Sequence, residues 1–233
     1  MLRILFCIVA TLVFLSCAET TPASTVKVVG KMSTVMKQGQ LNGQIATDSL
    51  NTDGAYGLGP IEYLQGEILL LEGQTYISKV LDSTSHKVTL ASSAKAPFFV
   101  YTTTSQLHHV HLLPGYYTLQ QLENQIDSIY NGYNEPLLVR IDGEFNNVKV
   151  HSVNLPHGTK VASPDDAHKG LTSYKYNNLR GTLIGFFSRR HKSIFTHHDS
   201  FFHAHFISQN RNIMGHVDEL HVNAKAIYLK VSK

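Results

Sequence analysis

Three histidines near the end of the chain have the residue type and spacing to bind a metal ion. His203 and His205 are separated by Ala204, so both imidazoles project from the same face of an extended strand. The Asn-rich run 209–215 ends in Gly and favours a loop that returns the next strand, so that His216 joins the pair. Three imidazoles with an open fourth position are typical of a catalytic zinc or another divalent metal. The alternative is a strand with two partly exposed histidines and an unrelated third.

Two charged residues in apolar surroundings are candidates for acting on a substrate. Glu67 lies in the expected strand 61–71, so it either faces solvent or is buried where it is paired or functional. Arg140 is also surrounded by apolar residues. Its guanidinium either forms an ion pair with Asp142 or Glu144, or receives an anionic substrate, because the guanidinium fork matches a carboxylate.

The composition is that of a globular protein with many histidines. The chain has 233 residues, enough for one sizeable domain or two small ones. Its formal charge is only +3, without a basic block interleaved with aromatic residues, so nucleic acid is not an expected partner. The 14 histidines cluster at 108–111, 197–205 and 216–221, which indicates metal chemistry.

The N-terminal sequence predicts export. Residues 1–16 have a positive start and an apolar stretch too short to span a bilayer comfortably, which is typical of a signal peptide. The sequence up to Cys17 resembles a bacterial lipobox, in which cleavage before the cysteine leaves it N-terminal and lipidated. The alternative is an ordinary signal peptide cleaved a few residues later. We expect a protein of the bacterial cell envelope, on the periplasmic side or at the cell surface, attached only by lipid on Cys17 through the polar tether 17–25.

The following sequence predicts β-sheets with few helices. Strand patterns begin at Val26, and the first extended segment continues to Lys37. A helix is expected over 119–129, because apolar residues there recur at helical spacing after a capping box that starts at Thr118.

A long polar stretch suggests two lobes. Residues 156–169 contain two prolines and mark the expected break between an N-terminal sheet lobe at 26–155 and a C-terminal lobe at 156–233. The predicted fold class is α/β of the α+β kind, with two lobes built on mixed or antiparallel sheets and the metal site on a β-hairpin of the C-terminal lobe.

Five separate motifs span nearly all of the chain after the signal. The motifs are Gly57-Leu58-Gly59 with Gly66-Glu67, Ala96-Pro97-Phe98, Arg140-Ile141-Asp142-Gly143, Gly181-Thr182-Leu183-Ile184-Gly185-Phe186, and His203-Ala204-His205-Phe206-Ile207-Ser208 with Gly215-His216-Val217. No single motif is decisive, but the set in this order and spacing is specific, and with it the chain resembles the α-acetolactate decarboxylase family.

The resemblance implies a zinc enzyme with two lobes that converts acetolactate to acetoin and carbon dioxide. It places His203, His205 and His216 on the metal, Arg140 near the substrate carboxylate, and Glu67 among the polar groups of the site. Decarboxylation leaves an enediolate, whose negative charge a metal stabilises as a Lewis acid, and Glu67 is a candidate for delivering the proton that follows.

Some residues depart from the family pattern and bear on substrate preference and stereochemistry. Pro60 stands where the family usually has Thr, no Glu follows Glu219, and the stretches 196–200 and 209–214 differ from the usual pattern. Two other functions are therefore kept: an exported lipoprotein that binds a metal or ligand without turnover, and a decarboxylase or isomerase for another 2-hydroxy-3-keto acid. The expected partner is a small-molecule substrate, and a homodimer is left open.

Overall fold

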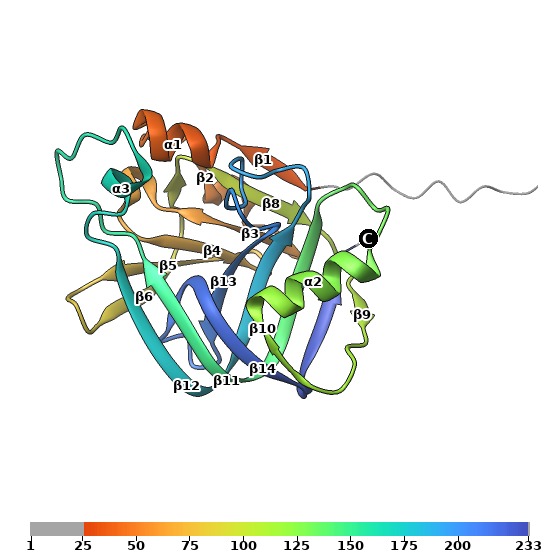
Figure 1. The fold of residues 1–233 in the computed structure, drawn as a ribbon. Helices are drawn as coiled ribbons and strands as arrows, with labels where there is room; N and C mark the ends of the chain where they lie inside the picture. The colour runs from red at the N-terminus through yellow and green to blue at the C-terminus, as the bar shows by residue number, and fades with distance from the viewer. Residues whose placement is uncertain (1–25, 233) are drawn as a thin grey trace, which may run out of the picture.

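The computed structural model describes residues 26–232 and contains two large antiparallel β-sheets (Figure 1). Cys17, the signal peptide and the whole tether 17–25 lie outside the described residues. The first sheet has six strands in the order β1-β8-β3-β4-β5-β6. Their bounds are Lys27–Val29 for β1, Phe99–Thr103 for β8, Ala55–Pro60 for β3, Glu67–Leu71 for β4, Gln74–Val80 for β5 and His86–Ala91 for β6.

The second sheet contains longer strands and curls until β13 pairs with β14. Its order is β10-β14-β11-β12-β13, β9 pairs with β14 as well, and a further β14–β13 pairing closes the four strands β14, β11, β12 and β13 on themselves. The strands are β9 His108–Val110, β10 Tyr116–Thr118, β11 Leu137–Ser152, β12 Thr172–Phe187, β13 Phe202–Ser208 and β14 Met214–Val231. Because closure removes two free edges, β11, β12, β13 and β14 form a ring of paired strands.

Helices are few, as predicted. The helix α2 (Leu119–Ile129) has the expected bounds, and its capping box of Thr118 and Gln121 is formed. Two shorter helices, α1 (Met32–Gln38) and α3 (Pro164–Ala167), contact each other beside the first sheet. Small elements complete the fold: β2 Ile45–Ala46 pairs with β7 Lys95–Ala96, and short 3-10 turns cover Thr47–Leu50 and Glu62–Leu64.

Two of the sequence-based boundaries need correction. The first extended segment ends with β1 at Val29, because Met32 and Val35 turn inward as one face of α1 and pack with Leu64 and Phe98. The expected lobe boundary between 155 and 156 falls between β11 and β12, which pair along their whole length from Leu137 to Ser152. A polar loop therefore connects two neighbouring strands of one sheet, and the second sheet already begins at β9.

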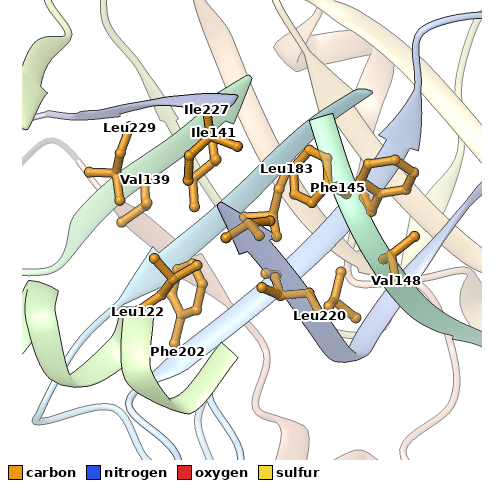
Figure 2. Packing of buried hydrophobic residues seen from close by; sticks show 14 of the residues in the cluster. Leu122, Val139, Ile141, Phe145, Val148, Leu183, Phe202, Leu220, Ile227 and Leu229 are labelled. Carbon is orange, nitrogen blue, oxygen red and sulfur yellow. The ribbon is translucent and has the colours of Figure 1, made fainter. Parts of the chain in front are cut away.

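Two clusters of buried side chains hold the second sheet in place. One lies inside the curled sheet and is covered by α2, whose Leu122 contacts the same cluster as Phe202 and Leu220 (Figure 2). The other joins the two sheets, with Leu58 and Leu69 of the first packed in one cluster with Ile184 and Ile207 of the second. No helix among residues 26–232 is long and apolar enough to cross a membrane.

Candidate metal centre

The structure brings together the three histidines on which the metal prediction rests. His203 and His205 lie on β13, and His216 lies on β14 directly opposite His205 in the strand register. One nitrogen from each ring lies within 4.8 Å of the corresponding nitrogens of the other two. All three side chains are buried, so the alternative of two partly exposed histidines and an unrelated third does not hold.

Local sequence explains why His216 reaches this position. Gly215 lies where β14 approaches β11, and a Cβ atom at this residue would lie only 2.5 Å from the carbonyl oxygen of His151. Glycine thus permits the close approach of two strands that places His216 opposite both His205 and His151.

The hydrogen bonds of the three rings leave nitrogen lone pairs available. Nδ1 of His203 lies 2.6 Å from the Phe195 carbonyl oxygen and donates to it, so its Nε2 carries the lone pair. Both ring nitrogens of His205 are buried without a hydrogen-bond partner among the described residues. A buried imidazole without partners is unfavourable unless something else binds it, and this donor set fits a divalent metal.

Burial keeps these imidazoles neutral, which is the form that binds a metal. Desolvation lowers the pKa of His205 to about 3, and burial together with the neighbouring imidazoles holds the pKa values of His203 and His216 well below the usual range.

Glu67 lies beside the three histidines and is buried, which decides between its two predicted environments. It starts β4 in the first sheet, and its Oε2 lies 3.6 Å from Nε2 of His205. Its Oε1 accepts a hydrogen bond of 3.1 Å from the backbone N–H of Val153. Burial raises the pKa of the Glu67 carboxyl well above its usual value.

Arg140 is not brought to the histidines. Its guanidinium donates to Asp142 at 2.7 Å, to Glu72 and to the Tyr56 hydroxyl at 3.3 Å. Glu72 follows the far end of β4, about 16 Å along an extended strand from Glu67. The ion pair with Asp142, one of the two roles expected from the sequence, is therefore formed, whereas Glu144 pairs with Arg180.

Three residues of the site were missed in the sequence. His151 of β11 packs against His216 with 4.5 Å between ring centroids, and its Nδ1 lies 2.6 Å from an Asp218 carboxylate oxygen. His197 places its Nε2 3.2 Å from Nε2 of His216. The histidine-rich cluster 197–205 hinted at His197, but the pairing of β11 with β14 that brings His151 here has no local signal.

A cleft of about 320 Å³ leads to this group from the surface. Its lining includes His197, His216 and Asp218, together with Asp199 and Ser200 of the loop that precedes β13. A larger cleft of about 640 Å³ lies elsewhere on the second sheet, and none of the three histidines lines it. The smaller cleft is therefore the one that reaches the histidine cluster.

Fold and site together define an antiparallel two-sheet protein with a buried three-histidine cluster at a cleft. A sequence profile of the α-acetolactate decarboxylase family matches residues 28–233, so the chain belongs to that family, a family of carboxy-lyases. This confirms the resemblance inferred from the motifs.

Individual relatives agree with the family assignment. The α-acetolactate decarboxylase of Methanosarcina mazei is 30% identical over 183 residues, which are 78% of this chain and 61% of the relative. That of Bacillus subtilis is 27% identical over 198 residues, 84% of this chain and 74% of the relative. The crystal structure of the Bacillus subtilis enzyme aligns with a TM-score of 0.75 at 25% identity, covering 90% of this chain and 85% of the other. The antiparallel architecture with few helices is thus the fold of this family.

Proposed function

We propose that this protein is a divalent-metal-dependent decarboxylase that converts acetolactate to acetoin and carbon dioxide. The observation that carries the proposal is the convergence of His203, His205 and His216, with buried neutral rings and two unpartnered nitrogens, beside the Glu67 carboxyl. Membership of the family supports the reaction, and the donor set supports the metal.

The three imidazoles would hold the metal, with zinc as the first candidate. When bound there, such an ion supplies Lewis acidity toward the keto and hydroxyl oxygens of a substrate. The hydrogen bond from Nδ1 of His203 to the Phe195 carbonyl oxygen fixes the tautomer and the orientation of the ring, so that its Nε2 can bind the metal.

The reaction itself asks two things of the chain. As the bond from the carboxyl carbon to C2 of acetolactate breaks, its electron pair passes into the neighbouring ketone to give an enediolate, and C2 must then receive a proton to give acetoin. The burial of Glu67 and of the three histidines keeps bulk water away from their side of the substrate while the charge develops. Glu67, fixed at one oxygen by Val153, is positioned to orient the substrate hydroxyl or to move the proton with the other oxygen.

The carboxylate of the substrate needs a different partner from the one expected. Arg140 is engaged with Asp142 and Glu72 at the other end of β4, so we do not assign it that role. His151, held by Asp218 and packed on His216, is the nearer polar side chain of β11. We place it among the groups that orient the substrate.

The test is to incubate the purified protein with acetolactate and to follow acetoin formation with and without a chelator. We expect metal-dependent turnover that His203→Ala abolishes together with metal content, whereas His198→Ala, at an 84% exposed side chain, retains both. Metal bound at full occupancy without acetoin formation would instead support the binding-only function. Turnover that survives complete metal removal would contradict the proposal.

A further inference from the structure

The loop 188–201, between β12 and β13, brings a fourth imidazole to the metal centre. Nε2 of His197 lies 3.2 Å from Nε2 of His216, and its ring centroid lies 5.0 Å from that of His216 and 6.0 Å from that of His203. His197 is partly buried, whereas the next residue, His198, points to solvent with 84% of its side chain exposed. Only the first of the two adjacent histidines is directed inward.

The distance between the two Nε2 atoms suits a shared ion. Two nitrogens bound to one tetrahedral zinc at about 2.0–2.1 Å from the metal lie about 3.3 Å from each other. In the absence of a metal the same contact requires one ring to donate a hydrogen to the lone pair of the other. The lone pair of His216 that this contact uses is the one available to a metal, so His197 either joins the coordination or competes with it.

The loop is fastened on both sides of His197, which fixes where the ring can go. On one side the Phe195 carbonyl oxygen accepts from Nδ1 of His203 at 2.6 Å. On the other side the Glu123 carboxylate of α2 accepts from the Ser200 hydroxyl at 2.5 Å and from the backbone N–H of Phe201 at 3.2 Å. His197 has no strand pairing of its own, so its ring is free to move from His216 toward His203 and His205, as binding one ion together with them would require.

We propose that His197 is a fourth protein ligand of the metal, completing a set of four imidazoles. The proposal rests on the proposed function only for the presence of the metal at His203, His205 and His216. Because His197 also lines the cleft to the surface, a substrate that enters through this cleft would displace it from the metal. It is thus a ligand of the substrate-free protein, carried on a loop, while the other three are fixed on strands.

The experiment compares His197→Ala with the matched variant His198→Ala in the full-length protein. Zinc affinity is measured by chelator competition, and coordination is read from the visible absorption of the Co²⁺-loaded proteins. We expect His197→Ala to weaken zinc binding by about 100-fold or more, above the range of residues that only support a ligand, and to change the Co²⁺ spectrum. His198→Ala should match the wild type in both.

An unchanged Co²⁺ spectrum with zinc affinity within about tenfold of His198→Ala would overturn the proposal and leave His197 as a neighbour of the ligands. A conservative His197→Gln variant and thermal unfolding of the metal-free proteins separate loss of a ligand from loss of folding. Acetoin formation by the wild type is measured alongside. If the wild type forms acetoin but His197→Ala leaves the Co²⁺ spectrum unchanged, only the fourth ligand is refuted. If His197→Ala changes the Co²⁺ spectrum but the wild type forms no acetoin, only the decarboxylase function is refuted.

Discussion

His205 illustrates how far one buried side chain constrains the chemistry. It is fully buried, both of its ring nitrogens lack a hydrogen-bond partner within residues 26–232, and a carboxylate oxygen of Glu67 lies 3.6 Å away. An apolar residue of similar size would avoid the penalty of about 1–3 kcal/mol for an unsatisfied polar group. The presence of an imidazole at this position is explained by the metal that we propose.

At this scale the role of Glu67 is open to a direct measurement. If its carboxyl moves a proton or orients the hydroxyl in the transition state, Glu67→Gln should lower turnover by roughly two to four orders of magnitude, with little change in substrate binding. Steady-state kinetics at saturating metal, with metal content measured in parallel, checks this. Near-full turnover of the variant would make Glu67 a structural carboxylate.

Arg140 leads to the opposite expectation. Its side chain is 18% exposed and is bonded to the partly buried Asp142 and the buried Tyr56, besides the exposed Glu72. Arg140→Met should therefore leave the Asp142 carboxylate and the Tyr56 hydroxyl without this partner and lower the free energy of unfolding by about 1–3 kcal/mol. Urea denaturation measures this loss, and metal content should stay unchanged. A weaker affinity for acetolactate without any loss of stability would return Arg140 to the substrate.

At the scale of elements, α2 is connected to the metal centre through the loop that follows β12. Besides the bonds of Glu123, Asp127 accepts from Nε of Arg189 at 2.6 Å, and Arg189 also donates to backbone carbonyls at the end of the helix. The helix thus covers the core and also holds both ends of the segment from Arg189 to Phe201.

This connection predicts a local effect of substitutions in the helix. Glu123→Ala removes the acceptor of the Ser200 hydroxyl and the Phe201 N–H, so hydrogen exchange of amides 196–202 should accelerate, by about 10-fold or more for a loss of 1.4 kcal/mol or above. Asn124→Ala, on the exposed face of the same helix, is the control and should leave exchange unchanged. Equal exchange in both variants would show that the loop is held by other contacts.

The whole molecule raises the question of where it works. Residues 1–17 predict an exported protein with lipid on Cys17. These residues lie outside the part of the chain that the structure describes. The exported location remains our proposal, and with it an enzyme that acts on substrate outside the cytoplasm.

The anchor can be tested separately from the enzyme. The native protein should partition into the detergent phase, and Cys17→Ser should abolish this partitioning, because a lipid chain contributes about 0.8 kcal/mol for each buried CH₂ and no helix within residues 26–232 replaces it. Phase separation followed by immunodetection measures the difference. Equal partitioning of the two proteins would favour the ordinary signal peptide.

The sequence by itself determined several local elements and the family, although it did not reveal the helix α1. Alternation placed His203 and His205 on one face of β13, the Asn-rich turn returned His216 to them, and the capping box set the start of α2, because each depends on neighbours only a few residues away. The three candidate metal ligands could therefore be predicted as a group, although not their burial.

Only the tertiary structure decided which distant residues join that trio. His151 arrives through the register of β11 with β14, Glu67 through the packing of the first sheet on the second, and His197 through a loop fastened to α2. The same long-range pairing kept Arg140 away from the histidines. Arg140 bonds to Glu72, which follows the end of β4, whereas Glu67 stands at the start of that strand. Strand register and sheet packing are set by the sum of many nonlocal contacts, which no short stretch of the sequence encodes.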